Sequence, residues 1–358
     1  MNRLNVCVIF GGYSNEHDVS LASANNVVSN LSREKYNVVP VYICEAGCWY
    51  LYEGSVGDIV NAKTMTHKHR VVLPADRGKN ALLKFEENGF SEIPVDVVFP
   101  VLLGKFGEDG TIQSLFEMAG LRYTGCGVLS SSVCMDKVFT NKLAERLGIA
   151  LPRFLYYSIS QKGNLSQMAD EIESTLEYPC FVKAVRSGSS IGTLKVRNRM
   201  QLESAIEEAF TVDSKIIVEE FIDGLELKCA LIDFGDGDVK ASNVMEVSIP
   251  DNKDFNDYET KYSATNKKVF IPANIPEEAA NTIKEWSIRL FKELDCNGLA
   301  RIDFFWDETT KRVIFNEVNT FPAFTAKSVF QKLFENLGYN IEQVLDGLIE
   351  LGMKRDML

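Results

Sequence analysis

The stretch from residue 298 to 319 constrains the fold most, because two apolar runs flank a short polar turn. The runs are Leu299–Trp306 and Val313–Val318, and this pattern predicts a β-hairpin. Side chains alternate between the two faces of a strand, so one face should carry Arg301, Asp303, Glu317 and Asn319. Buried carboxylates need a cation. The cation could be Mg²⁺, which prefers carboxylate and phosphate oxygens, or simply Arg301 neutralising Asp303.

Length and charge narrow the class of protein. At 358 residues the chain exceeds the size of a single core, so two or three domains are expected. A net charge of -12 argues against nucleic acid or an anionic membrane as a partner, and a polyanionic ligand would need local cations. No apolar run has the length of a signal peptide or a transmembrane helix, so a cytoplasmic location is expected. The eight scattered cysteines predict buried free thiols.

The N-terminal segment predicts a Rossmann-like unit. An apolar run over residues 5–10 reads as a buried strand, and Gly11 and Gly12 lead to a helical pattern from about Ser20. The turn lacks the GxGxxG spacing, so a dinucleotide is not expected. Glu16 lies in this turn, at the carboxyl end of the first strand, where open α/β sheets bind ligands. It could instead only complement the positive end of the next helix.

A second α/β unit carries a serine- and glycine-rich loop. Lys183 lies on a predicted strand, residues 187–192 form the loop, and another strand starts near Thr193. Backbone N–H groups and hydroxyls of such a loop can wrap phosphate oxygens, with Lys183 as a nearby charge. The loop is not a Walker A motif, since no helix follows it. An ordinary hairpin turn remains the alternative.

Two further segments could contact a nucleotide. The predicted strand Lys215–Ile222 ends in carboxylates, and Glu226 follows a tight turn, which could place the Glu226 carboxylate against ribose hydroxyls. The alternative is a solvated acidic edge. The polar segment Asp251–Lys268 is long enough for a functional lid, in which Lys261 and Tyr262 are the candidates for chemistry.

Taken in order, these features resemble the ATP-grasp enzymes, and among them the D-alanine:D-alanine ligase family. The matching segments are FGGYSNEHDVS at 10–20, GKFGEDGTIQ at 104–113, CMDK at 134–137, VKAVRSGSSIG at 182–192, VEEFIDGLE at 218–226, RIDFF at 301–305 and NEVNTFP at 316–322. EHDVS and GCGVLSSSVCMDK look most like the vancomycin-resistance branch, whose members join D-alanine to D-serine or D-lactate. The resemblance implies an α/β ATP-grasp fold with a Rossmann-like N-terminal domain (1–125), a small central domain (126–216) and a C-terminal mixed-sheet domain (217–358).

The resemblance also assigns roles to individual residues. Nucleotide binding falls to Lys137, Lys183, Ser187, Gly188, Ser190, Glu219, Glu220, Ile222, Glu226 and Lys261. Two Mg²⁺ ions, with Mn²⁺ as an alternative, would be held by Asp303, Glu317 and Asn319. Glu16 would fix the ammonium of the first amino acid through Ser189 and Tyr262, while Ser328 would hold the carboxylate of the second. Arg301 would meet the oxyanion formed when an amine attacks an acyl phosphate.

Four positions depart from the family pattern. Leu103 replaces a histidine, Ala184 a proline and Ala323 a glycine, and Ser328-Val329-Phe330-Gln331 replaces a Ser-Arg-Tyr-Pro helix start. If Ala323 had a positive φ, it would be strained by roughly 1 kcal/mol. Most of these changes are expected at the amino-acid subsites, so the identity of the second substrate, the acceptor, stays open.

The first hypothesis is a ligase of D-alanine with D-alanine or D-serine, in peptidoglycan precursor synthesis or glycopeptide resistance. By analogy with the family, tyrosine rather than histidine at the lid position, here Tyr262, favours an amine acceptor over D-lactate. Alternatives are a related ligase with another acceptor, or a nucleotide-binding pseudo-ligase. The expected partners are ATP, D-alanine and a second D-amino acid, with neither nucleic acid nor membrane, and the family implies a homodimer.

Overall fold

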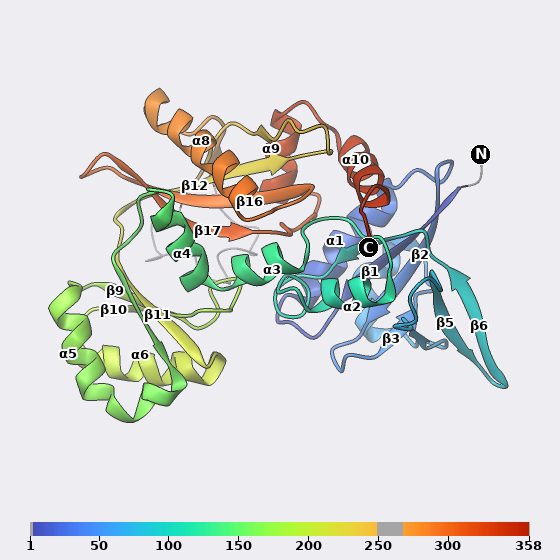
Figure 1. The fold of residues 1–358 in the computed structure, drawn as a ribbon, viewed down its shortest axis with the longest axis horizontal. Coiled ribbons are helices and arrows are strands. Elements are labelled where there is room, and N and C mark those ends of the chain that lie inside the picture. Colours follow the sequence, from blue (N-terminus) through green and yellow to red (C-terminus); the bar gives the residue numbers. More distant parts are fainter. Residues whose placement is uncertain (1–2, 249–267, 358) are drawn as a thin grey trace.

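The computed structural model describes residues 3–248 and 268–357, which form three lobes, each built on its own main β-sheet (Figure 1). The N-terminal sheet has the order β3-β2-β1-β7, in which β1 pairs in parallel with both β2 and β7. Its strands are β1 (Leu4–Gly11), β2 (Tyr36–Ile43), β3 (Trp49–Leu51) and β7 (Val97–Val101). The predicted first strand and the Rossmann-like parallel pairing are therefore present.

Helices α1 (His17–Asn30) and α2 (Thr111–Ala119) and a 3₁₀ segment, Val56–Thr64, belong to the same lobe. A small antiparallel sheet, β4 (Val71–Val72), β5 (Ala81–Glu86) and β6 (Gly89–Pro94), extends from it. The turn after β1 places Glu16 immediately before α1, although the Glu16 side chain makes no capping hydrogen bond to that helix. Glu16 therefore lies at the positive end of α1, where its carboxylate could complement the helix, without capping the helix by a hydrogen bond.

The central lobe holds the serine-rich loop. Its antiparallel sheet has the order β10-β9-β11-β8. The elements are β8 (Phe154–Ser158), a 3₁₀ segment (Ile159–Asn164), α5 (Leu165–Thr175), β9 (Cys180–Ala184), β10 (Thr193–Val196), α6 (Arg199–Val212) and β11 (Lys215–Glu220). Since β11 belongs to this sheet, the predicted domain boundary after residue 216 falls inside a strand, and the boundaries at 125/126 and 216/217 stay predictions.

The C-terminal lobe contains the predicted hairpin. Its sheet has the order β15-β14-β12-β16-β17, with β13 paired to β12. The strands are β12 (Gly224–Ile232), β13 (Lys240–Ala241), β14 (Met245–Val247), β15 (Val269–Phe270), β16 (Leu299–Asp307) and β17 (Arg312–Asn319). Helices α8 (Glu277–Glu293), α9 (Val329–Asn336) and α10 (Ile341–Met353) complete the lobe, and α10 contacts α1 and β7 of the N-terminal lobe (Figure 1).

Two short helices, α3 (Val128–Met135) and α4 (Lys137–Arg146), run between the lobes. The sequence pattern from roughly residue 131 to 147 predicts a single helix, and this prediction is wrong because Asp136 interrupts the helix. The Asp136 carboxylate accepts hydrogen bonds from the backbone N–H groups of Val138 and Phe139, which caps a new helix at Lys137. This break fixes Lys137 at the first position of α4, beside the serine-rich loop.

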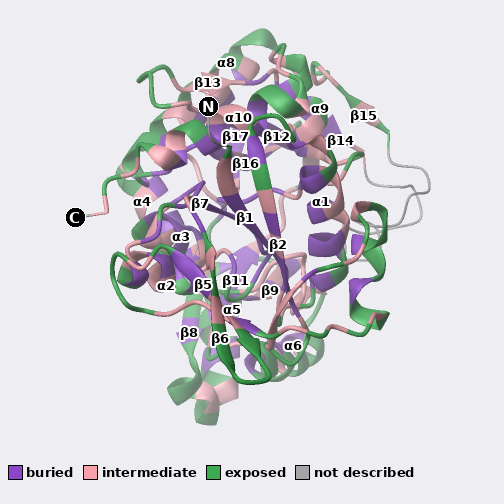
Figure 2. Ribbon diagram, turned by 90° about the vertical axis from the view of Figure 1, so that its right-hand side faces the viewer, coloured by how far each residue is buried: buried purple, intermediate pink, exposed green. Residues whose placement is uncertain are grey.

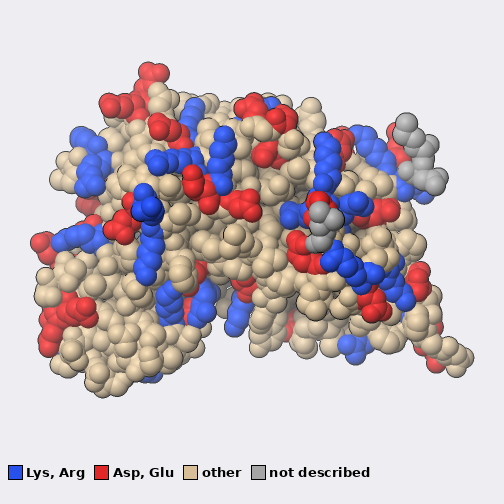
Figure 3. All heavy atoms as spheres, viewed as in Figure 1, with Lys and Arg blue, Asp and Glu red and all other residues tan. Residues whose placement is uncertain are grey.

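Apolar packing joins the lobes. The largest core cluster includes Val8 and Phe99 of the N-terminal sheet together with Phe324 and Leu345 of the C-terminal lobe. Buried residues concentrate in the strands at the centre of the molecule, whereas exposed residues lie on the outer helices and loops (Figure 2). On the face shown in Figure 3, lysines and arginines are interspersed with carboxylates. No helix among the described residues is both long and apolar enough to cross a membrane.

Candidate active site

Two neighbouring cavities contain nearly all of the predicted site residues. The first is lined by Lys137, Pro152, Phe181, Lys183, Ser187, Ser190, Thr193, Glu219, Glu220, Phe221, Ile222, Asp223, Gly224, Glu226, Phe305, Asn316 and Glu317. The second has among its lining residues Glu16, Leu103, Glu108, Gly188, Ser189, Lys228, Arg301, Glu317, Asn319, Ala323 and Ser328. Glu317 lines both cavities, so a ligand in one would meet a ligand in the other at this carboxylate.

The serine-rich loop separates the two cavities. Ser187 and Ser190 line the first cavity, whereas Gly188 and Ser189 line the second. Lys137 Nζ donates a hydrogen bond of 2.9 Å to the Ser187 carbonyl oxygen, which ties α4 to the loop. Ser189 and Ser190 have φ values of 52° and 60°, a left-handed backbone conformation that residues other than glycine seldom adopt. Such strained backbone is typical of ligand-binding loops.

Lys183 is paired with Glu219 on the floor of the first cavity. The Lys183 Nζ lies 2.5 Å from Glu219 Oε2, and Asn141 Nδ2 donates to Glu219 Oε1 at 3.2 Å. Glu219 is buried, so this pairing compensates a carboxylate that would otherwise be costly. The Glu220 side chain turns away to Arg153, at 2.7 Å, so only its backbone remains for nucleotide contacts.

The hairpin brings its four polar residues to one face, as predicted. Asp303 and Glu317 are direct cross-strand partners, and so are Arg301 and Asn319. Arg301 donates to Asp303 from Nε to Oδ1 at 2.7 Å and from Nη2 to Oδ2 at 2.9 Å. The salt bridge considered as an alternative is therefore present. Asp303 lies beneath the cavities, only 1% exposed, rather than lining either of them.

Lys228 is a site residue that the sequence reasoning missed. It lies on β12 directly opposite Asp303 on β16. Its Nζ is 2.8 Å from Asp303 Oδ2 and 2.6 Å from Glu226 Oε1. Burial acts to lower the pKa of Lys228, but Asp303 and Glu226 outweigh burial, so the pKa is raised and the ammonium stays charged. The signal was a lysine in an apolar strand, two residues after Glu226 and hence on the same face.

Glu16 is held against two glycines and a serine. Ser189 Oγ donates a short hydrogen bond to Glu16 Oε1, a contact that the family resemblance implied. A Cβ atom on Gly104 would lie 2.6 Å from Glu16 Oε2, and one on Gly188 would lie 3.0 Å from it. A side chain at Gly104 would therefore displace the Glu16 carboxylate, and one at Gly188 would press against it. The role of Glu16 in holding an ammonium group stays a prediction.

Glu108 is the second residue that the sequence reasoning missed, although it lies in the GKFGEDG motif. The backbone N–H groups of Gly104 and Phe321 donate to its two carboxylate oxygens at 2.6 Å and 3.2 Å. Burial, and then the nearby Glu16 carboxylate, raise the pKa of Glu108 to about 8. At pH 7 the Glu108 carboxyl group in the second cavity is therefore mostly protonated.

This raised pKa predicts a pH effect on stability. Between the ordinary carboxyl pKa of 4.5 and about 8, the folded protein retains the Glu108 proton and the unfolded chain releases it. The contribution of Glu108 to the free energy of unfolding should therefore fall as pH rises through that range. We expect the difference in unfolding free energy between wild type and Glu108→Gln, measured by denaturant titration, to decrease from pH 5 to pH 8. A difference that stays constant across this range would contradict the pKa shift.

The departures from the family pattern group around the second cavity. Leu103, Ala323 and Ser328 line it, whereas Ala184 is buried in β9. Outside glycine, positive φ values among the described residues occur at Asn80, Phe106, Ser189, Ser190, Asp295 and Lys311, so the strain considered for Ala323 does not arise. Gln331 accepts a hydrogen bond from Asn26 Nδ2 at 3.1 Å and does not line the cavity. Ser328 caps α9, accepting from the Gln331 N–H, and places the positive end of that helix at the cavity.

The hairpin suits a hard divalent cation. Asp303, Glu317 and Asn319 offer only oxygen ligands of the type that Mg²⁺ prefers. The Asn319 Nδ2 atom is buried and has no hydrogen-bond partner among the described residues. Within residues 3–248 and 268–357, no group of three or more His, Cys, Asp or Glu side chains is placed to hold a metal ion by itself.

Two predicted residues, Lys261 and Tyr262, lie outside the described residues.

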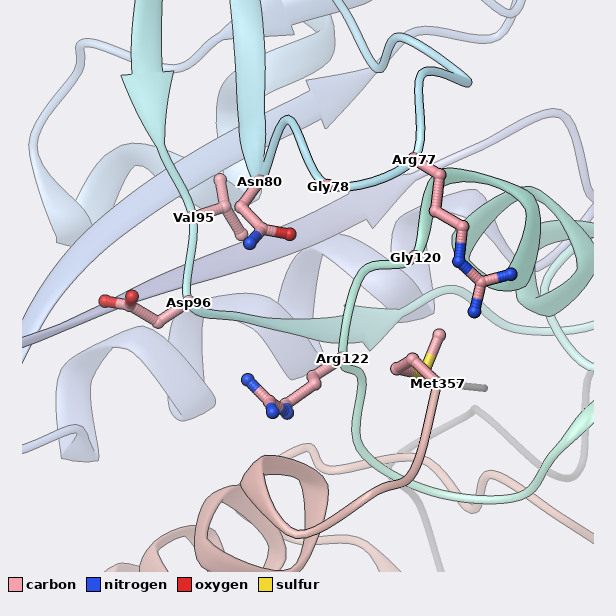
Figure 4. Close-up of a pocket in the computed structure, with 8 residues that line it drawn as sticks. All are labelled: Arg77, Gly78, Asn80, Val95, Asp96, Gly120, Arg122 and Met357. Atoms are coloured by element: carbon pink, nitrogen blue, oxygen red, sulfur yellow. The ribbon is translucent and has the colours of Figure 1, made fainter.

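A further hollow in the N-terminal lobe shares no lining residue with the two cavities described above (Figure 4). It is lined by Arg77, Gly78, Asn80, Val95, Asp96, Gly120, Arg122 and Met357. Asp96 is already engaged there by the backbone and side chain of Asn5, at 2.7 Å and 3.0 Å. The chemistry of the molecule therefore centres on the other two cavities.

A lysine-bearing sheet with a serine-rich loop, facing a hairpin of carboxylates across a cavity, is the arrangement of an ATP-grasp enzyme. The model for the N-terminal part of the D-ala D-ala ligases matches residues 5–126, and the model for the C-terminal part matches residues 143–350. The chain therefore belongs to the D-alanine–D-alanine ligase family.

Individual relatives match over nearly the whole length. The D-alanine–D-alanine ligase of Caldicellulosiruptor bescii is 43% identical, over 99% of this chain and 97% of that protein. The crystal structure of the VanG D-Ala:D-Ser ligase from Enterococcus faecalis is 38% identical, with a TM-score of 0.87 over 98% of this chain and 100% of the other. The D-alanine–D-alanine ligase structure from Coxiella burnetii is 30% identical, with a TM-score of 0.82 over 99% and 95%. These likenesses agree with the predicted ATP-grasp fold.

Proposed function

We propose that this chain is an ATP-dependent ligase that joins D-alanine to a second D-amino acid, releasing ADP and phosphate, for the synthesis of peptidoglycan precursors. The observation that carries the proposal is the position of Glu317, which lines both the lysine-bearing cavity and the second cavity. A nucleotide in the first cavity would thus present its terminal phosphate to an amino acid in the second. The family to which the chain belongs supports the choice of D-alanine.

ATP fits the chemistry of the first cavity. Phe181 and Ile222 offer apolar surface for adenine, and the Glu226 carboxylate can accept hydrogen bonds from ribose hydroxyls. Lys137 and Lys183 offer point charges for the phosphates, beside the backbone of the serine-rich loop. The negative charge of the whole protein would repel ATP, so these local cations supply the attraction.

The reaction requires activation of a carboxylate. A carboxylate oxygen of D-alanine attacks the γ-phosphorus and ADP leaves, which gives an acyl phosphate. The amine of the second amino acid then attacks the acyl carbon, and phosphate leaves. Arg301 and a backbone N–H near Ala323 would stabilise the oxyanion of the tetrahedral intermediate. Glu16, buttressed by Ser189, would hold the ammonium of the first D-alanine, and Ser328 the carboxylate of the second amino acid.

A divalent metal would be held by Asp303, Glu317 and Asn319. When bound, it would neutralise charge on the transferring phosphoryl group. We propose two Mg²⁺ ions, replaceable by Mn²⁺, because the family uses its hairpin carboxylates in this way. A homodimer and a cytoplasmic location are likewise proposed from membership of the family.

D-serine as acceptor is a second candidate, with a role in glycopeptide resistance. The observation that favours it is the change in the second cavity, where Leu103 and Ala323 stand at positions that are histidine and glycine in the family. The VanG D-Ala:D-Ser ligase, which shares the fold, also supports this possibility.

The test is phosphate release from ATP and Mg²⁺ with D-alanine alone, and then with D-serine, D-lactate or other amino acids added. We expect release with D-alanine and a D-alanyl dipeptide identified by mass. Competition between D-alanine and D-serine for the second position decides between the two acceptors. ATP binding without phosphate release for any D-amino acid would contradict the ligase, and would favour another acceptor or a nucleotide-binding pseudo-ligase.

A further inference from the structure

Lys228 is the most deeply buried cation among the site residues that the structure describes. It is 5% exposed, it lines the second cavity, and its ammonium lies between two carboxylates from different strands. One is Glu226, proposed to bind ribose, and the other is Asp303, proposed to bind the metal. No part of the proposed reaction uses Lys228. An ammonium buried in this way is costly unless it is compensated by charge, so its contacts point to an electrostatic role.

The carboxylates around the hairpin are in contact with cations of the protein itself. Among the described residues, the carboxylates of Glu226, Asp303 and Glu317 are in contact with the cations Lys228, Arg301 and Lys137. Lys137 approaches Glu317 at 3.5 Å, and the two other cations share Asp303. A divalent ion entering this set alone would add two positive charges beside carboxylates that already contact cations. A nucleotide would bring the phosphate charges that compensate them.

We propose that Lys228 is the fixed cation that balances Asp303 and Glu226 in the metal-free enzyme, and that it thereby makes metal binding depend on bound nucleotide. This inference rests on the proposed metal-binding role of Asp303. Lys228 occupies the Oδ2 atom of Asp303, so an incoming metal must share that carboxylate with it. Without Lys228, Arg301 would still contact Asp303, but Glu226 and Asp303 would lose the cation that they share, and a metal ion could take its place. Lys228 is a positioning residue, since it acts through Asp303.

The experiment compares Mn²⁺ binding in wild type and Lys228→Met, each with and without ADP. Free Mn²⁺ is counted by electron paramagnetic resonance in the absence of Mg²⁺. Wild type should bind Mn²⁺ weakly alone and much more tightly with ADP. In Lys228→Met, binding without ADP should tighten by about 10–100-fold, the scale on which outer-sphere partners alter metal affinity. The ratio of the Mn²⁺ dissociation constants without and with ADP should shrink accordingly.

Two further variants separate charge from folding. Lys228→Gln loses the charge but keeps N–H donors for both carboxylates. It should therefore fold without Mn²⁺ even if Lys228→Met needs Mn²⁺ to fold. Its Mn²⁺ affinity without ADP should change as in Lys228→Met. Lys63→Met removes a lysine from the exposed Lys63–Asp18 pair and should bind Mn²⁺ like wild type. In EDTA, the melting temperature of Lys228→Met should be lower than that of wild type, and Mn²⁺ should restore it. The melting temperature of Lys63→Met should not change when Mn²⁺ is added.

The outcomes distinguish this inference from the proposed function. If wild type binds no Mn²⁺ even with ADP, the metal-binding role of the hairpin is wrong. If wild type binds Mn²⁺ with ADP but Lys228→Met and Lys228→Gln show unchanged affinity without ADP, the role of Lys228 is wrong and the metal site stands. Tightened binding in both Lys228 variants, with Lys63→Met unchanged, supports the inference.

Discussion

Replacing Arg301 by methionine should lower kcat by about 10²–10³-fold, the usual loss when a single oxyanion donor is removed. Arg301 lines the second cavity beside Glu317 and Asn319, where the acyl carbon would lie. Its guanidinium carries five N–H donors in a planar fork, of which Nε and Nη2 donate to Asp303. ADP binding should change little, because Arg301 does not line the first cavity.

Steady-state phosphate release gives kcat, and ADP binding is measured by calorimetry. The matched control is Arg301→Lys, which keeps the charge near Asp303 but loses the planar fork, and we expect it to recover only part of the rate. Lys228 still compensates Asp303 in both variants, so they should remain folded. A folded Arg301→Met enzyme with a kcat within threefold of wild type would exclude the oxyanion role.

Replacing Lys183 by methionine should abolish tight ATP binding and destabilise the protein by about 3–5 kcal/mol, as expected for a buried carboxylate that loses its partner. Glu219 is 4% exposed, and Lys183 lies 2.5 Å from it. Without the lysine, the Glu219 carboxylate keeps the hydrogen bond from Asn141 among the described residues, but that amide carries no charge. The same substitution also removes a point charge from the cavity in which the phosphates would lie.

The double variant Lys183→Met, Glu219→Gln separates the two effects. A neutral glutamine can still accept from Asn141, so the free energy of unfolding should return close to the wild-type value. ATP binding should remain lost, because the phosphate charge is still missing. The free energies come from denaturant titration and the ATP affinities from calorimetry. Restored ATP binding in the double variant would show that Lys183 acts only on stability.

Local periodicity was sufficient for the hairpin. The alternation of side chains depends only on the extended backbone, so Arg301, Asp303, Glu317 and Asn319 could be placed on one face before any contact was known. The order of the motifs along the chain likewise indicated the family, because such an order of short patterns is specific even where each pattern is weak. The helix expected over residues 131–147 failed, since the capping of α4 by Asp136 overrode a continuous helical pattern.

The tertiary structure decided which charges meet and which of them keep their protons. Lys228 and Asp303 are 75 residues apart in the sequence and became neighbours only through the pairing of β12 with β16. The proton on Glu108 depends on burial and on the distance to Glu16, neither of which a sequence pattern contains. The sequence by itself thus determined the fold, the family and most of the polar groups of the site. How those groups compensate one another depends on strand register and on desolvation, which exist only in the folded protein.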